Sequence, residues 1–297
     1  MFCAACGEPT ASSPCTACGA DPLLRGTWRL DAVLGRGASG TTWAGTRLAD
    51  GHRVALKELR NVHNPKEREL ADREARVLRE LEHPQLARFE DSFVEGTGKH
   101  ATRWILQELI QGEDLHQEAT HRRYDEAEVR AVIDGLLPVL AYLHSRRPPV
   151  IHRDIKPRNV LRRPDGTLVL VDFGSVRDFW GDPDVGASTV AGTFGYMAPE
   201  SFRGEATPAT DLYGVGALAV YLLTRREPGE LSARTGELRW AEAVHVSPEL
   251  RALLARLLDP DPARRTLAPV ADEQQWRWVL AAFGAVIILM FGLAWMH

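Results

Sequence analysis

Carboxylate, amide and amine side chains lie close together in two neighbouring stretches of the chain. The first is His152-Arg153-Asp154-Ile155-Lys156-Pro157-Arg158-Asn159, and the second is Asp172-Phe173-Gly174. Transfer of the terminal phosphoryl group of ATP needs bound Mg²⁺, an acceptor held in line and groups that disperse negative charge. The two stretches offer oxygen ligands for a metal, a carboxylate that can orient a hydroxyl, and a cation. These residue types therefore indicate phosphoryl transfer.

Further motifs precede and follow these two stretches, and their order resembles that of eukaryotic-type (bacterial Hanks-type) serine/threonine protein kinases. The resemblance covers residues 26–270. It implies an α+β, bilobal protein-kinase fold with an antiparallel-sheet N-lobe and a helical C-lobe. It also implies transfer of the ATP γ-phosphoryl group to Ser/Thr hydroxyls of proteins, with ATP and Mg²⁺ (or Mn²⁺) as cofactors. The other motifs are Gly35-Arg36-Gly37-Ala38-Ser39-Gly40, Val54-Ala55-Leu56-Lys57, Glu74 and Ala198-Pro199-Glu200.

The resemblance gives each catalytic residue a role. Asp154 accepts a hydrogen bond from the substrate hydroxyl and takes its proton late in transfer, while Lys156 stabilises the migrating phosphoryl charge. A lysine at this place is typical of Ser/Thr rather than Tyr kinases. Asn159 and Asp172 are the Mg²⁺ ligands.

Two more charged residues complete the catalytic set. The resemblance implies that Lys57 contacts the α- and β-phosphates of ATP and that Glu74 is its ion-pair partner, with Glu69 as the alternative. In each case the competing interpretation is an ordinary surface charge. It is weakened for Glu74 because Val77, Leu78, Leu81 and His83-Pro84 continue the helix register of the family.

The nucleotide site is expected to begin at the glycine-rich segment. Its spacing also occurs in dinucleotide-binding folds, but those require a following helix, whereas Thr41-Thr42-Trp43 continues as a strand. By the resemblance, backbone groups of Glu108 and Ile110 bind adenine, Asp114 contacts ribose, and Ala55 and Leu161 close on the purine. The full expected set is Leu34, Gly35, Gly37, Gly40, Thr42, Ala55, Lys57, Glu108, Ile110, Asp114 and Leu161.

Regulation is expected in the stretch before Ala198. Kinases with an arginine at the position of Arg153 often use it to hold a phosphorylated loop, and a phosphate adds about −1.5 to −2 charges. We therefore expect autophosphorylation at Ser188 or Thr189, with Thr189 favoured; the alternative is that both are ordinary loop hydroxyls. The resemblance also implies that Thr193 ties the substrate loop to Asp154. Supporting contacts are expected from Glu200 with Arg265 and from Asp211.

All four cysteines lie in residues 1–20, as Cys3-x-x-Cys6 and Cys15-x-x-Cys18. Four thiolates at this spacing suit tetrahedral Zn²⁺, and so short a segment needs the metal to fold. We therefore predict a structural zinc ribbon, followed by a linker at 21–25. Redox pairs or disulfides are the alternative. Metal removal is expected to unfold residues 1–20 and leave the kinase lobes folded.

The C-terminal end of the sequence is apolar. Residues 279–296 contain no charged residue, and a helix of this length approaches the thickness of a bilayer core. Trp276, Trp278 and Trp295 bracket it, as aromatic side chains do at bilayer interfaces. We predict a juxtamembrane segment at 271–278 and a single-pass transmembrane helix at 279–296 that anchors a cytoplasmic kinase domain. A docked amphipathic helix is the alternative, and the small residues at Ala281 and Ala285 are compatible with dimerisation.

The elements that position these residues can be read from hydrophobic periodicity. Short strands are expected at 30–34, 41–48, 53–59 and 167–171, and helices at 66–82, 125–145 and 211–223. The net charge of −4 gives no general case for nucleic-acid binding. Two rival functions remain, a pseudokinase scaffold and a zinc-dependent nucleic-acid adaptor. The retained catalytic residues argue against the first, and the few cations among the cysteines argue against the second.

Overall fold

The computed structural model describes residues 1–37, 40–59, 65–97, 101–173, 192–232 and 238–265. The chain divides into two compact units, Met1–Arg265 and Thr266–His297, and the second lies wholly outside the described residues. The predicted segments 271–278 and 279–296 therefore lie outside the described residues. Ser188 and Thr189 also lie outside them, between residues 173 and 192. Within the described ranges, the structure contains no helix of the length and apolar character that a bilayer span requires.

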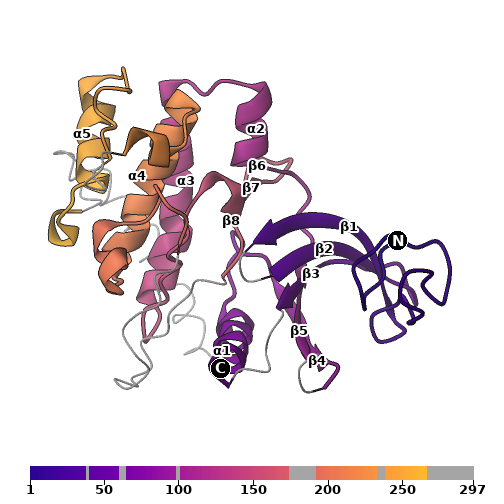
Figure 1. Ribbon diagram of the computed structural model, residues 1–297. Helices are drawn as coiled ribbons and strands as arrows, with labels where there is room; N and C mark the ends of the chain where they lie inside the picture. Colours follow the sequence, from indigo (N-terminus) through magenta and orange to yellow (C-terminus); the bar gives the residue numbers. More distant parts are fainter. Residues whose placement is uncertain (38–39, 60–64, 98–100, 174–191, 233–237, 266–297) are drawn as a thin grey trace, which may run out of the picture. The chain divides into compact units, whose positions relative to one another are not determined.

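The first half of the described chain forms an antiparallel sheet in the order β1-β2-β3-β5-β4 (Figure 1). The strands predicted at 30–34, 41–48 and 53–59 are confirmed as β1, β2 and β3. Side chains alternate between the two faces of each strand, so one face of β3 carries Val54 and Leu56 and the other Ala55 and Lys57. The strand bounds are β1 Trp28–Gly37, β2 Gly40–Arg47, β3 Arg53–Leu59, β4 Phe89–Glu95 and β5 Thr102–Glu108.

One helix belongs to this half of the chain. Helix α1 (Pro65–Glu80) confirms the helix predicted at 66–82, and it ends just before His83-Pro84, where the proline cannot continue the helical hydrogen bonds. Its residues Ala71, Ala75 and Leu78 are buried. Glu74 shares this buried part of the helix, which places a carboxylate among apolar side chains.

The remaining helices form the second half. Helix α3 confirms the predicted helix, begins after a capping box in which Asp125 accepts from the Glu128 N–H, and continues through Pro138. Helix α4 is apolar nearly throughout and buried from Thr210 to Leu222, as its sequence predicts. The helices are α2 Leu115–His121, α3 Glu126–Ser145, α4 Pro208–Thr224 and α5 Pro248–Leu257, and the 3₁₀ turns are Pro157–Asn159, Pro199–Arg203, Pro228–Leu231 and Pro262–Arg264.

A small sheet in the order β6-β7-β8 lies in this second half. Its strands are β6 Glu113–Asp114, β7 Val160–Arg162 and β8 Leu168–Leu170, the last of which confirms the strand predicted at 167–171. The segment after α1 is tied to this region, because the side-chain amide of Gln85 donates to the carbonyls of Gly135 and Leu168 at 2.6 and 3.2 Å. Gln85, shortly after α1, therefore contacts both α3 and β8.

Candidate active site

Lys57 is the point where residues distant in sequence meet. Its Nζ lies 2.7 Å from Oε1 of Glu74 and 2.6 Å from Oδ1 of Asp172, which is 115 positions further along the chain. Burial opposes the charge of Lys57, but the carboxylates of Asp172 and Glu74 outweigh it and raise the pKa of Lys57 above its usual range. The ammonium group is thus held charged and oriented by two acids.

The ion-pair partner of Lys57 is the first of the two that the sequence suggests. Glu74 is buried on α1, whereas Glu69, one and a half turns earlier on the same helix, is exposed. Because the ammonium group is itself buried, a carboxylate of α1 can reach it only from the buried side of that helix. Glu74 meets that condition.

Asp154 accepts hydrogen bonds from three side chains of the site and from one backbone amide. Its Oδ1 accepts from the N–H and the hydroxyl of Thr193 at 3.0 and 2.9 Å. Its Oδ2 accepts from Lys156 Nζ at 2.7 Å and from the side-chain amide of Asn159 at 3.0 Å. Lys156 also donates to the Thr193 hydroxyl at 2.7 Å, so the carboxylate, the ammonium and the hydroxyl form a closed triangle. This arrangement fixes the orientation of Asp154.

The backbone beside Asp154 is strained and is braced from below. Arg153 has φ of 68°, a conformation that costs about 1–3 kcal/mol for a residue other than glycine. The buried carboxylate of Asp211 on α4 accepts from the N–H groups of His152 and Arg153 at 3.0 and 2.8 Å, and from the His144 ring at 2.8 Å. Asp211 thus holds the loop in the conformation that presents Asp154, the role expected from the sequence.

Asn159 and Asp172 have the chemistry of a Mg²⁺ site. The N–H of Val171, the residue before Asp172, donates to the Asn159 carbonyl at 2.9 Å, which links the two stretches. The Asn159 side-chain nitrogen is used by Asp154, so its oxygen is the atom available to a cation. One oxygen of Asp172 contacts Lys57, and its side chain is 42 % exposed. Hard oxygen ligands with room for water and phosphate suit Mg²⁺, so these residues fit the ion.

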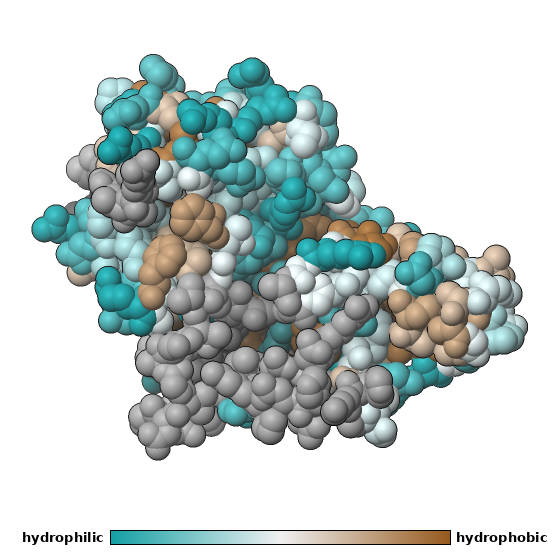
Figure 2. Space-filling view, viewed as in Figure 1, coloured by the Kyte–Doolittle hydropathy of each residue, from teal (hydrophilic) through white to brown (hydrophobic). Residues whose placement is uncertain are grey.

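The glycine-rich segment forms the ends of β1 and β2, where Gly37 pairs with Gly40. Gly40 has φ of 149°, and a Cβ there would lie 1.7 Å from the Glu58 carbonyl oxygen, so no other residue fits. The predicted Leu34 on β1 is 52 % exposed. In Figure 2 a hydrophobic, brown region lies at the place that β1 occupies in Figure 1. An apolar surface of this kind beside glycines suits the edge of a flat, apolar ring.

The expected adenine-binding residues come from two sheets that meet here. Thr42 is the register partner of Lys57, so Thr42, Ala55 and Lys57 share one face of the large sheet. Ile110 forms a small apolar cluster with Ala87 and Val169, against which Leu161 packs. The N–H of Glu108 donates to the Arg88 carbonyl, which leaves the Glu108 carbonyl as the candidate for contact with adenine.

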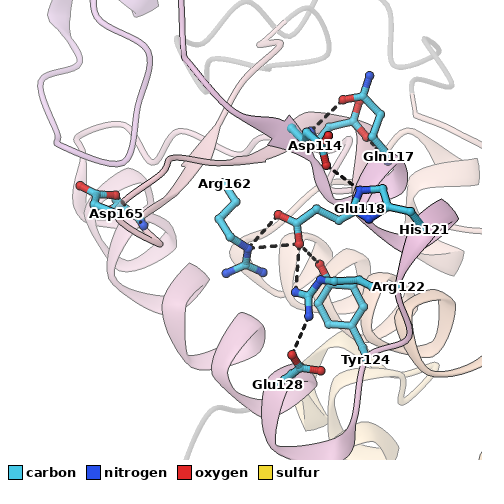
Figure 3. A network of polar contacts seen from close by, with 11 residues as sticks. Asp114, Gln117, Glu118, His121, Arg122, Tyr124, Glu128, Arg162 and Asp165 are labelled. Carbon is cyan, nitrogen blue, oxygen red and sulfur yellow. Dashed lines mark hydrogen bonds and ion pairs between the residues drawn. The ribbon is translucent and has the colours of Figure 1, made fainter.

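Asp114, the expected ribose contact, is positioned by a polar network that sequence reasoning did not identify (Figure 3). Its Oδ1 caps α2 by accepting from the Gln117 N–H at 2.8 Å. Four residues on, the buried Glu118 accepts from Arg162 at 2.9 Å, from Arg122 at 3.0 Å and from the Tyr124 hydroxyl. Strand β6 pairs Asp114 with Leu161 and Glu113 with Arg162. Because Glu118 binds Arg162, it stabilises the strand pair that carries Asp114 and Leu161, the two expected nucleotide contacts.

The four cysteines, all near the N-terminus, lie close together in space. Sγ of Cys3 lies 3.7 Å from that of Cys18, Sγ of Cys6 lies 3.9 Å from that of Cys15, and all four sulfurs lie within 4.8 Å of one another. A tetrahedron with metal–sulfur distances of about 2.3 Å has edges of about 3.8 Å, so the cluster can hold a metal ion. Disulfides require about 2.05 Å, and all four cysteines are free.

The thiols of the cluster differ in acidity. Burial raises the pKa of Cys3, and for Cys6 a backbone hydrogen bond from Glu8 is outweighed by burial and the neighbouring thiols, which raise the pKa, whereas Cys15 favours the thiolate. Hydrogen bonds from the Cys18 and Ala17 amides lower the pKa of Cys15 to about 6. Gly7 and Gly19, both with positive φ, end the two turns, and their N–H groups donate to the carbonyls of Cys3 and Cys15 at 2.8 Å. Such turns bring amides toward sulfur, and this fits a tetrathiolate metal site.

The fold and the site therefore define a class of protein that combines a buried lysine paired with two acids and a loop whose single carboxylate, Asp154, is held by Lys156, Asn159 and Thr193. A family model for the protein kinase domain matches residues 28–277. The chain is 34 % identical over 267 residues to the serine/threonine-protein kinase PknA of Nostoc sp., covering 82 % of this chain and 46 % of that protein. It is 36 % identical over 271 residues to serine/threonine-protein kinase C of Synechocystis sp., covering 85 % and 50 %.

A mouse protein, serine/threonine-protein kinase PAK 1, is 33 % identical over 219 residues, which cover 73 % of this chain and 38 % of that protein. The chain belongs to the protein kinase family. It spans about half the length of the bacterial curated relatives named here. The two-lobed expectation for the catalytic domain, with an antiparallel sheet followed by helices, agrees with this membership.

Proposed function

We propose that the protein is an ATP-dependent serine/threonine protein kinase that transfers the γ-phosphoryl group of ATP to Ser/Thr hydroxyls of proteins. The observation that carries the proposal is the triangle of Asp154, Lys156 and Thr193, whose side chains lie within 2.7–2.9 Å of one another. A carboxylate held beside an ammonium group can orient an acceptor hydroxyl and take its proton, while the ammonium stabilises the transferred charge.

The remaining residues of the site bind and orient ATP. Asn159 and Asp172 would hold Mg²⁺, which would supply positive charge to neutralise the phosphates. Lys57 supplies a second cation to the phosphates, and its pairing with Glu74 fixes where that cation lies. The residues around Leu34, Ala55 and Leu161 supply the apolar surroundings of the purine, and Asp114 supplies an acceptor for ribose.

Incubation of the full chain with labelled ATP and Mg²⁺, followed by mapping of labelled residues, tests the proposal. Asp154→Asn keeps the size of the side chain and serves as the matched control. We expect label on Ser or Thr in the wild-type protein and its loss in the variant, with ATP binding retained. Absence of transfer by the wild type, or equal transfer by both proteins, would contradict the proposal.

We further propose autophosphorylation of the activation loop, with Thr189 favoured over Ser188. The support is Arg153, which precedes Asp154 and whose φ of 68° is held by Asp211. A phosphate at Thr189 would offer this arginine a doubly charged ligand. The same phosphopeptide map tests this point, and active enzyme without phosphate at Ser188, Thr189 or their neighbours would rule it out.

The metal of the cysteine cluster is proposed to be structural Zn²⁺. The support is the set of sulfur–sulfur distances, which matches the tetrahedral preference of this ion. Cys3, Cys6, Cys15 and Cys18 would all ligate it, which leaves no open position for catalysis. Metal analysis of the purified full chain is expected to give one zinc per chain, and Cys6→Ser with Cys18→Ser is expected to abolish it.

Membrane anchoring through residues 279–296 is proposed from the sequence of that segment, with the kinase domain in the cytoplasm, where ATP is supplied. Its uninterrupted apolar composition and flanking tryptophans support a bilayer span. Fractionation of cells that express the full chain tests this, and Leu289→Arg, within the segment, is the sensitive variant because a central charge opposes insertion. Recovery of the wild type in the soluble fraction would contradict the anchor.

A further inference from the structure

The face of the large sheet that points away from Lys57 is strongly apolar. On β3, Val54 and Leu56 are both 0 % exposed and alternate with Ala55 and Lys57. An antiparallel sheet can leave one face in water only when that face is polar, so this one requires a cover. The buried cluster on this side consists of Leu24, Trp28, Leu30, Trp43, Val54, Leu56, Phe93, Trp104 and Leu106.

The cover comes from the cysteine-containing segment, residues 1–24. Phe2 and Ala4 pack against the cluster, and the ring of Phe2 lies 5.3 Å from that of Trp43, at an interplanar angle of 54°. Leu24, in the expected linker, is only 2 % exposed and belongs to the cluster itself. The segment therefore packs against the face of the sheet.

Backbone hydrogen bonds add to this packing. The Phe2 N–H donates to the Leu30 carbonyl at 2.8 Å, and the two residues form an antiparallel bridge at β1. Strand β1 is an edge strand of the sheet, so its outer backbone groups are free to pair with another segment. Phe2 uses one of them, and this fixes the segment in register with the sheet.

Phe2 is adjacent to the cysteine cluster both in sequence and through backbone pairing. Phe2 precedes Cys3, which is 0 % exposed, and it also bridges to Pro9, on the far side of the first cysteine turn. Residues 1–20 have too little apolar surface to hold this loop on their own, so cross-linking of the sulfurs by a metal would supply the rigidity. With a metal bound by the four cysteines, Phe2 would be fixed in place on the sheet.

A short chain of contacts leads from Phe2 to the phosphate-binding lysine. The Trp43 indole N–H donates to Oε2 of Glu58 at 3.2 Å, in a buried contact between β2 and β3. Glu58 is the neighbour of Lys57, and Thr42, the neighbour of Trp43, is the register partner of Lys57. Trp43 thus lies on β2 next to the residue pair Thr42 and Lys57, and its ring contacts Phe2 on the face of the sheet opposite Lys57.

We propose that the partner of the cysteine module is the kinase's own sheet: residues 1–24 form its outer layer, and metal binding at the cysteines holds β2 and β3 in the geometry that binds nucleotide. Phe2 and Trp43 are positioning residues in this arrangement. Only the expected effect on catalysis rests on the proposed kinase function; the packing of residues 1–24 on the sheet does not. It replaces the expectation that residues 1–20 unfold without effect on the lobes.

The test uses the full chain and two readouts that need no catalysis, the Kd for a fluorescent ATP analogue and hydrogen exchange of residues 41–59. Zn²⁺ is removed with a nitrogen-donor chelator, because such ligands prefer Zn²⁺ to Mg²⁺. We expect the Kd to rise about tenfold and the amides of β2 and β3 to exchange faster. Unchanged exchange in β2 and β3 after metal loss would overturn the proposal.

Phe2→Ala separates the contact from the metal, because it leaves all four cysteines in place. We expect one zinc per chain, a raised Kd and faster exchange in β2 and β3, with Phe2→Leu restoring both values toward the wild type. Glu8→Ala, at an exposed residue of the same module, is the matched control and should change neither. A wild-type Kd in Phe2→Ala would refute the role of Phe2.

Failure of this inference and failure of the kinase proposal give different results. If the full chain transfers no phosphoryl group while Phe2→Ala and metal removal still raise the Kd, the kinase activity is refuted and the inference stands. If transfer is observed while the Kd and the exchange of β2 and β3 remain unchanged in both experiments, the inference alone is refuted.

Discussion

Arg265 donates one hydrogen bond to each carboxylate oxygen of Glu200, from Nη1 to Oε1 at 2.6 Å and from Nη2 to Oε2 at 2.9 Å. Their side chains are 0 % and 2 % exposed. Glu200 lies in the 3₁₀ turn Pro199–Arg203, and Arg265 is the last described residue of the chain. The pair therefore joins the turn Pro199–Arg203 to the end of the described chain through a bidentate contact, a geometry that a lysine cannot form.

Replacement of Arg265 by leucine should destabilise the protein by about 3–5 kcal/mol, because it leaves a buried carboxylate without its cation. The measurement is the free energy of unfolding of the full chain in urea at pH 7. Arg203→Leu is the matched control, since Arg203 pairs with Glu205 on the surface, with both side chains 61 % exposed. Such exposed pairs contribute little. Equal effects of the two substitutions would contradict the assignment.

The pH dependence of this pair has a definite sign. Burial opposes ionisation of Glu200, but hydrogen bonds from Arg265 and Thr210 outweigh it and hold the pKa of Glu200 below its usual value of 4.5. A lowered folded-state pKa adds stability above the unfolded-state pKa, and this part is lost as the pH falls through the folded-state value. The difference in unfolding free energy between wild type and Arg265→Leu should therefore shrink from pH 7 to pH 4. A difference that grows on acidification would refute the argument.

The Thr193 hydroxyl bridges Asp154 and Lys156, so its removal should affect the chemical step. Thr193→Val keeps the shape but loses both contacts, and hydrogen bonds to charged groups contribute about 1.5–3 kcal/mol. We expect kcat to fall about 10-fold to 150-fold, with little change in the KM for ATP. Thr193→Ser restores the hydroxyl and should recover most of the rate. A valine variant with wild-type kcat would show that the bridge has no part in transfer.

The chain of catalytic groups could be predicted from the sequence because each group belongs to a motif with fixed local spacing. Asp154, Lys156 and Asn159 lie within six residues of one another, and their mutual contacts follow from one loop. The same holds for the strand pairing of Thr42 with Lys57, since alternation along β2 and β3 sets which side chains share a face. Local rules were sufficient for these residues.

Other contacts could not be predicted, because they join segments whose local sequences carry no signal of each other. Glu118 and Arg162 are 44 residues apart, and each looks like an ordinary surface charge. Phe2 is a single apolar residue without periodic neighbours, so nothing in residues 1–20 indicated that it packs on Trp43. Only the tertiary arrangement brings these partners together.

Glu74 should matter for ATP use, whereas Glu69, on the same helix, should not. Glu74→Gln removes the charge that pairs with Lys57 but keeps the shape, so the ammonium group is less firmly placed at the phosphates. A lost charge-assisted contact of about 1.5–3 kcal/mol predicts a fall in kcat/KM for ATP of about 10-fold to 150-fold. Glu69→Gln is the matched control. If both variants lose the same activity, the pair with Lys57 is not the cause.

Glu118 is expected to control the affinity for ATP through the segment that carries Asp114 and Leu161. Glu118→Gln keeps a hydrogen-bonding side chain but removes the charge that holds Arg162 and Arg122, so the pairing of β6 with β7 loosens. The free energy of unfolding should fall by about 1.5–3 kcal/mol, and the KM for ATP should rise more than kcat changes.

The control for Glu118 is Asp134→Asn, which removes the acid of an exposed pair with Arg130 on α3, where both side chains are about half exposed, at 50 % and 53 %. Initial rates at varied ATP give the KM, and urea unfolding gives the stability of the same preparations. Asp134 bonds to Arg130 and takes no part in the Glu118 network. Removal of its charge should therefore leave the KM for ATP unchanged. A KM for ATP in Glu118→Gln no higher than that in Asp134→Asn would mean that the network stabilises the fold without positioning the nucleotide.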